Sequence, residues 1–164
     1  MTPLRQRFID DLRLRNYAPR TITTYVAAVA HFARHGGRSP EQLDAEHVRR
    51  YQLHLLAQRA SWSRCNQAVA ALRFLYRITL QRPDLLPMLP YGKKPKSLPA
   101  VLSPDEVARL FEAVADPTHR LILQTAYAAG LRVSEVVRLQ VGDIDAARML
   151  LHVRAAKGRK DRLV

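Results

Sequence analysis

Two cations near the end of the sequence have the type and spacing for chemistry on a phosphate group. Arg132 lies in the run Gly130-Leu131-Arg132-Val133-Ser134-Glu135, between a glycine expected to end one helix and a serine expected to cap the next. A guanidinium held in this way can stabilise charge on phosphoryl oxygens in a transition state. Lys157 precedes a glycine at a predicted hairpin tip, where its ammonium group can protonate a leaving oxygen. Local pattern alone is explained equally well by a structural ion pair between Arg132 and Glu135.

Short helices followed by a hairpin are expected to position this pair. Ser103-Pro104-Asp105-Glu106 has the form of a capping box that opens a helix with an apolar face. A second helix is predicted over about residues 118–129, and Ser134 is expected to cap a third that runs to about Gln140. Residues 150–154 favour a strand, and residues 162–164 favour the start of its partner.

The N-terminal half of the sequence predicts four helices. Apolar residues at spacings of three and four indicate helices over about residues 3–15, 20–35, 46–59 and 63–80. Ser39-Pro40-Glu41-Gln42 again has capping-box form, which predicts a short turn before the third helix.

A proline-rich segment follows the four helices. Proline removes an amide donor and clashes with the preceding turn, so no helix is expected over residues 81–100. We therefore expect a domain at 1–82, a linker at 83–100 and a second domain at 101–164. Lys93, Lys94 and Lys96 make this linker basic, and two interpretations stay open: it lies along a phosphate backbone, or it is merely solvated.

The composition favours a globular protein with a polyanionic partner. The net charge is +13 with a pI near 10.8, and apolar residues make up 48% of the chain. Most of the cations are arginine, which suits phosphate and guanine contacts but is also produced by a genome rich in G and C. A single cysteine, Cys65, excludes an internal disulfide and a thiolate metal cage. No signal peptide or membrane span is recognisable, so a cytoplasmic location is expected.

These motifs together resemble the tyrosine recombinases, the phage-integrase and Xer-like family. The run from Gly130 to Glu135, followed at this distance by the Lys-Gly-x-Lys-x-Arg form at Lys157, is similar to the start of that family's catalytic domain. The run Tyr17-Ala18-Pro19-Arg20-Thr21-Ile22-Thr23-Thr24-Tyr25 is similar to part of its SAM-like DNA-binding domain. The resemblance implies a mainly α fold: a four-helix SAM-like domain, then the first half of an α+β catalytic domain with an incomplete β-hairpin.

The resemblance also implies roles for individual residues. Arg132 would be the first catalytic arginine, Lys157 the catalytic lysine, and Glu135 a supporting acid that holds the local geometry. The family's reaction is a metal-free transesterification by a tyrosine, which implies no cofactor and no metal site. The implied partners are double-stranded DNA and further recombinase protomers. Besides the three linker lysines, the DNA-contact candidates are all helix-borne: Arg20, Thr21, Thr24, Arg64, Asn66, Gln67 and Arg73.

The sequence departs from the family pattern after Lys157. The family's His-x-x-Arg motif and nucleophilic tyrosine lie downstream of this lysine, whereas the seven residues that follow it here include no His, Trp or Tyr. Matches to His-x-x-Arg at His31, His35 and His47 precede Arg132 and are interpreted as decoys for catalysis. We therefore expect a truncated recombinase that binds DNA but does not cleave it. A functional recombinase that continues past Val164, and a non-catalytic DNA-binding regulator, remain alternatives.

Overall fold

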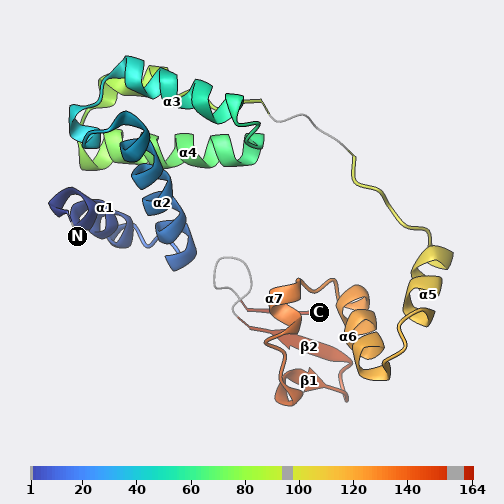
Figure 1. Cartoon of the computed structure of the whole chain (residues 1–164). Helices are drawn as coiled ribbons and strands as arrows, with labels where there is room; N and C mark the ends of the chain where they lie inside the picture. Colours follow the sequence, from blue (N-terminus) through green and yellow to red (C-terminus); the bar gives the residue numbers. More distant parts are fainter. Residues whose placement is uncertain (1, 94–97, 155–160) are drawn as a thin grey trace. The chain divides into compact units, whose positions relative to one another are not determined.

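The computed structural model describes residues 2–93, 98–154 and 161–164, and the chain divides into two compact units, Met1–Ser97 and Leu98–Val164 (Figure 1). Helices dominate the first unit, and the second combines helices with a small antiparallel sheet. The expected mainly α fold is confirmed.

Four α-helices build the first unit, and each begins where the sequence supplies a cap or a proline. Their bounds are α1 Pro3–Leu14, α2 Pro19–Gly36, α3 Ala45–Ala57 and α4 Trp62–Phe74. The side chains of Thr2, Asp44 and Ser61 accept hydrogen bonds from amides of the first turns of α1, α3 and α4. Gly37 ends α2 with a φ of 66°, a conformation that glycine adopts without strain. A π-helical turn, η2 Leu75–Thr79, continues α4.

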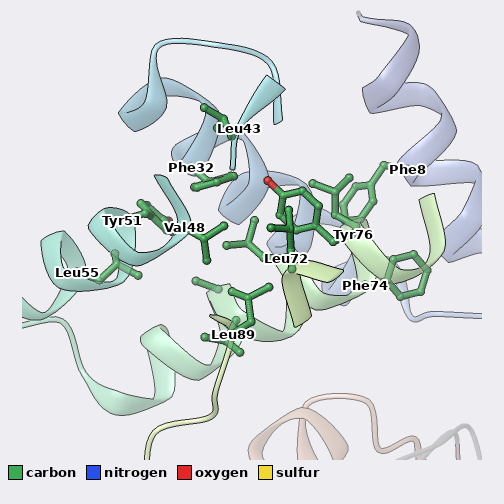
Figure 2. Close-up of a cluster of buried hydrophobic side chains, with 14 of the residues drawn as sticks. Phe8, Phe32, Leu43, Val48, Tyr51, Leu55, Leu72, Phe74, Tyr76 and Leu89 are labelled. Carbon is green, nitrogen blue, oxygen red and sulfur yellow. The ribbon is translucent and has the colours of Figure 1, made fainter. Parts of the chain in front are cut away.

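The core of this unit is a cluster of aromatic and aliphatic side chains drawn from all four helices (Figure 2). Phe32 packs edge-on against Tyr51, with ring centroids 5.1 Å apart. The hydroxyl of the buried Tyr76 donates to the carbonyl of Pro40 at 3.1 Å, so its polar atom is satisfied. Burial raises the pKa values of Tyr51 and Tyr76 to about 12. Tyr51 and Tyr76 therefore belong to the core of the first unit.

Of two local predictions for this unit, one is confirmed and one is wrong. The short turn predicted before α3 is the 3-10 helix η1, Pro40–Gln42, although the side chain of Ser39 caps no amide among the described residues. The segment after Gln81, expected to lack helix, forms the 3-10 helix η3 Pro83–Met88. A 3-10 turn tolerates the two prolines because Pro83 stands at its start, where no amide donor is needed, and the burial of Leu85 holds the turn to the core.

The second unit contains three α-helices and a three-stranded sheet. Their bounds are α5 Pro104–Glu112, α6 Pro117–Ala128, α7 Val133–Val136, the 3-10 helix η4 Val141–Asp143, β1 Ile144–Asp145, β2 Leu150–Val153 and β3 Arg162–Leu163. The strands are antiparallel in the order β1-β2-β3. The capping box is confirmed: Ser103 N donates to Glu106 Oε2 at 2.7 Å, and Glu106 N donates to Ser103 Oγ at 3.3 Å.

Three further features of this unit bear on the sequence predictions. Gly130 reverses the chain after α6 with a φ of 57°, as expected. Ser134 does not cap the next helix, because α7 already begins at Val133 and Arg132 occupies the cap position. Strand β1 was not predicted, since its two residues are too few to show alternation.

Unit Leu98–Val164 has little hydrophobic core of its own. Among its described residues, the buried hydrophobic side chains are Val107 and Val153. Large apolar residues on its helices and turns remain exposed, including Leu121, Tyr127 and Val137. No helix in the described parts of the chain is long and apolar enough to cross a membrane.

Candidate functional site

A buried carboxylate, Glu135, organises the residues around Arg132. Glu135 Oε2 accepts a hydrogen bond from the backbone amide of Arg132 at 2.9 Å, which fixes the first turn of α7. Its Oε1 accepts a second bond from Nη1 of the Arg132 guanidinium at 2.8 Å. One carboxylate therefore holds both the backbone and the side chain of Arg132.

A second arginine reaches the same carboxylate from the sheet. Arg162, at the start of β3, donates from Nη2 to Glu135 Oε2 at 2.9 Å and from Nη1 to Oε1 at 3.4 Å. Its Nη2 also lies 3.4 Å from the carbonyl oxygen of Gly130. Arg162 therefore joins the sheet to the loop that carries Arg132, and we call Arg132, Glu135 and Arg162 the arginine cluster.

The electrostatics of this cluster favour the ionised form of Glu135, and the Arg132 side chain stays accessible. The hydrogen bond from the Arg132 amide lowers the pKa of Glu135 below its ordinary value, and both guanidinium groups act in the same direction. The Glu135 side chain is only 5% exposed, whereas that of Arg132 is 55% exposed. A fixed, partly exposed guanidinium of this kind can bind an anionic oxygen with little reorganisation.

A second buried carboxylate, that of Asp143 in η4, makes similar contacts with a backbone amide and an arginine. Asp143 Oδ2 accepts a hydrogen bond from the amide of Gln140 at 3.0 Å. Its Oδ1 lies 2.6 Å from Nε of Arg154, the residue after β2, and the Asp143 side chain is 3% exposed. Glu135 and Asp143 are the buried charged residues of the described chain. Each ties the start of a helical turn to an arginine at the edge of the hairpin.

Lys157, the predicted catalytic lysine, lies outside the described residues. The strands before and after it are described and paired, with His152 opposite Leu163 and Val153 opposite Arg162. The predicted strand pairing on both sides of this position is therefore confirmed.

Several of the DNA-contact candidates in the first unit lie close together. Thr24, Arg64 and Gln67 line a surface hollow between α2 and α4, which also includes His31 and Arg34. We call it the α2/α4 hollow. The two remaining candidates on α2, Arg20 and Thr21, lie in its first turn, where Arg20 is exposed and Thr21 half-buried.

Asn66 and Arg73 instead bind the protein's own backbone. The Asn66 amide donates to the carbonyl of Gly92 at 2.9 Å and accepts from the Gly92 amide at 2.8 Å. Nη1 of Arg73 donates to the carbonyls of Leu86 and Leu89 at 3.1 and 2.9 Å. The polar groups of both side chains hold the proline-rich segment against α4.

The linker lysines are described only in part. Lys93 follows Gly92 and is exposed, whereas Lys94 and Lys96 lie outside the described residues. The contacts of Asn66 and Gly92 therefore position the backbone next to Lys93.

Sequence reasoning assigned no role in the site to Arg162, Asp143 or Arg154. One feature of the sequence could have identified Arg162: it begins the predicted strand that follows Lys157. Nothing local pointed to Glu135 as its partner, because the pairing depends on strand register. Charged residues that flank a short predicted hairpin are thus worth testing as partners for a nearby buried acid.

Comparisons with known proteins agree on the two halves of the chain. Residues 4–84 match the family model described as the phage integrase N-terminal SAM-like domain. Residues 100–164 match the model of the phage integrase family.

Individual relatives give the same result over the whole chain. The Sinorhizobium fredii protein named "Putative integrase/recombinase y4qK" is 46% identical over 167 residues, covering 100% of this chain and 54% of its own length. The tyrosine recombinase XerA of Thermococcus kodakarensis is 38% identical over 162 residues, covering 97% of this chain and 55% of its own length. A crystal structure of XerA recombinase aligns with a TM-score of 0.48 at 28% identity, covering 98% of this chain and 57% of that chain.

The chain spans about half the length of the curated relatives it matches. The matches nevertheless include both the helical first unit and the unit that holds Arg132 and Glu135. The chain therefore belongs to the phage integrase, or tyrosine recombinase, family.

Proposed function

We propose that this chain binds duplex DNA and brings Arg132 to a DNA phosphate, as one part of the machinery of site-specific recombination. The observation that carries the proposal is the arginine cluster. Glu135 is buried and Arg132 is more than half exposed, although 2.8 Å separates Oε1 of one from Nη1 of the other. A purely structural ion pair would require no accessible guanidinium, whereas a phosphate-binding arginine does.

Each member of the site has a defined task in this proposal. Arg132 stabilises negative charge on the non-bridging oxygens of the phosphate, and Lys157 supplies a proton to the leaving oxygen. Glu135 and Arg162 act as positioning residues, because they contact Arg132 and its loop. The residues need no metal ion or cofactor for these tasks.

Strand cleavage is not expected of these 164 residues alone. The family's nucleophile is a tyrosine downstream of the lysine, and the residues after Lys157 include none. Tyr51 and Tyr76 are buried, and their raised pKa values disfavour the phenolate that attack on phosphorus would use. The proposed activity is therefore DNA binding with an incomplete catalytic site.

A gel experiment tests both parts of this proposal. The chain is mixed with a nicked, end-labelled duplex and divided between a native gel and a denaturing gel. We expect retarded DNA on the native gel and no protein-linked DNA on the denaturing gel. Failure to retard DNA at low salt would contradict DNA binding, and a covalent adduct at any tyrosine would contradict the incomplete site.

A second candidate function rests on the length of the relatives. Because the chain covers 54% and 55% of two recombinases, a further polypeptide could supply the missing nucleophile to Arg132 and Lys157. The test is a fusion of Val164 to the unmatched remainder of the Sinorhizobium relative, assayed on a duplex with which that relative forms an adduct. Covalent DNA from the fusion, lost with Arg132→Ala and retained with Arg148→Ala, would support this candidate; no adduct from the folded fusion would oppose it.

A further inference from the structure

Three histidine rings form a row along α2 and α3 of the first unit. The rings of His35 and His54 are stacked at 4.4 Å between centroids with an angle of 28° between their planes. His31 continues the row at 6.3 Å from His54, again at 28°. Its Nδ1 lies 2.9 Å from the hydroxyl of the buried Tyr51, which fixes the ring. We call His31, His35 and His54 the histidine row.

The histidine row joins two surface hollows. His31 lines the α2/α4 hollow, with Thr24, Arg34, Arg64 and Gln67 among its other lining residues. His35 and His54 line a second hollow between α2 and α3, which also contains His47 and Arg50. Neither hollow has a carboxylate among the described residues that line it. The surface thus offers many donors and positive charges, and the carboxylates near it lie outside the lining of the two hollows.

The charged and titratable groups around the row come from α2, α3 and α4. Arg34 on α2, Arg50 on α3 and Arg64 on α4 are exposed cations that act on His31 or His35. Tyr51 and Cys65 are the buried titratable neighbours. On the rim, the carboxylates that start α3 are already engaged: Asp44 lies 2.6 Å from Nδ1 of His47, and Glu46 lies 3.8 Å from Nη1 of Arg49.

This environment disfavours protonation of His31 and His35 in the free protein. Burial first, and then the neighbouring cations, lower the pKa values of His31 and His35. Tyr51 stays protonated, since burial raises its pKa to about 12. The bond between His31 and Tyr51 survives a change of charge, because the phenol can donate to a neutral ring or accept from a protonated one.

We propose that the histidine row and the flanking Arg34, Arg50 and Arg64 form a contact strip for the phosphate backbone of duplex DNA, and that this strip takes up protons when it binds. The inference rests on the proposed DNA binding. It adds which residues contact the DNA backbone and how pH changes the affinity. Phosphates in the two hollows would supply counterions to this strip. The histidines would then add positive charge where the DNA backbone lies.

The direction of the pH dependence follows from linkage. A bound phosphate favours the protonated imidazole, so the pKa values of His31 and His35 are higher in the complex than in the free protein. Binding and proton uptake must reinforce each other by the same factor. Affinity for DNA therefore rises as the pH falls through the interval between the two pKa values, and it is constant on either side.

The hollows of this strip also contain two of the His-x-x-Arg matches that the sequence analysis interprets as decoys for catalysis. His31 with Arg34 and His47 with Arg50 have the His-x-x-Arg form, and a spacing of three puts both members on one helix face. The first pair lines the α2/α4 hollow, and the second lines the hollow between α2 and α3. Each pair therefore lines one of the two hollows, and both pairs are remote in sequence from Arg132.

The test is calorimetric titration of the whole chain with a duplex of about 24 base pairs, at constant salt, between about pH 7.5 and about pH 5.5. Buffers of different ionisation enthalpy give the number of protons taken up. We expect uptake of about one proton and an affinity that rises about tenfold over this interval. The variant with H31Q, H35Q and H54Q should bind with little pH dependence, while His119→Gln, in the other unit, should behave as the parent chain.

Each outcome decides the inference. Affinity that does not change with pH, or proton uptake that is unchanged in the triple variant, would overturn the strip while leaving DNA binding intact. No binding at any pH would overturn the proposed function and the strip with it. If circular dichroism shows that the triple variant does not fold, Arg64→Gln replaces it in the test. The strip requires that Arg64→Gln weaken DNA binding and reduce proton uptake, although all histidines are present.

Discussion

Arg162 donates a hydrogen bond to the buried carboxylate of Glu135 at 2.9 Å, and so ties strand β3 to the helix that follows Arg132. The two residues are far apart in sequence and meet only because β2 and β3 pair. Their contact makes the geometry around Arg132 depend on the pairing of β2 and β3, the strands that precede and follow Lys157 in the sequence. The proposed phosphate site and the fold of the second unit are therefore coupled.

Glu135→Gln is expected to loosen the second unit. The substitution preserves size but removes the charge that both Arg132 and Arg162 contact, at a cost of about 1–3 kcal/mol in the free energy of unfolding. Amide exchange resolved by segment measures this loss. Glu112→Gln, at the exposed end of α5, is the matched control and should be neutral. Equal protection of α7 and β3 in both variants would contradict the role given to Glu135.

The same carboxylate predicts how the second unit responds to acid. The pKa of Glu135 is lower in the folded chain than its ordinary value, so its contribution to stability is fully present above that ordinary value. It is lost as the pH falls through the lowered pKa. Urea unfolding followed between about pH 6 and about pH 3 should show this acid loss in the parent chain and a smaller one in Glu135→Gln. Identical pH profiles would exclude Glu135 as its source.

The first unit should lose stability over a higher pH interval. The pKa values of His31 and His35 are lowered by folding, so the unfolded chain binds more protons than the folded one as the pH drops below their ordinary value of 6.5. Stability is full above that value and declines below it. Thermal unfolding of the parent and of His35→Gln, compared at about pH 7.5 and about pH 5.5, measures the effect. A decline of the same size in His35→Gln would contradict it.

Gly92→Ala tests the attachment of the proline-rich segment. An added Cβ at Gly92 would overlap the six-membered ring of Trp62, whereas Gly142 has no atom within 4 Å of the equivalent position. Gly92→Ala should cost about 1–3 kcal/mol, and Gly142→Ala should cost much less. Trp62 is the single tryptophan, so its fluorescence reports the change directly, with a shift to longer wavelength expected. Unchanged emission and stability in Gly92→Ala would refute the close packing.

Local sequence signals predicted the helices well where a cap or a helix-ending glycine acts within one turn. Ser103 forms its capping box, and Gly130 reverses the chain, because both effects depend only on residues three or four positions away. The 3-10 helix at Pro83–Met88 was missed because the burial of Leu85, rather than helix propensity, stabilises it. Tertiary packing overrides the proline pattern there.

The candidate site shows the same limit for polar residues. Arg132 and Glu135 were found because their partnership spans a single turn. Arg162 was missed because strand register brings it to Glu135. Asn66 and Arg73 have the composition of DNA contacts, yet their polar groups bind backbone groups of the proline-rich segment. Residue type alone does not distinguish an acceptor on DNA from one on the protein itself.

Arg64→Gln should weaken DNA binding more than a matched change elsewhere on the first unit. Arg64 lines the α2/α4 hollow with Arg34 and His31, so its loss removes one phosphate contact and reduces affinity about threefold to tenfold at low salt. Arg77→Gln, an exposed arginine of η2 outside that hollow, is the control. Competition binding with labelled duplex measures both. An equal loss from the two variants would mean that the hollow has no special part in binding.

The most direct measurement of the central claim, duplex DNA binding by this chain, is its affinity for a labelled duplex across a series of salt concentrations. The account predicts binding at low salt. The logarithm of the association constant should fall linearly with the logarithm of the salt concentration, with a slope of about −0.9 for each phosphate contacted. Several contacts are expected from a chain with a net charge of +13 and clustered arginines. Absence of binding at low salt, or an affinity independent of salt, would contradict the account.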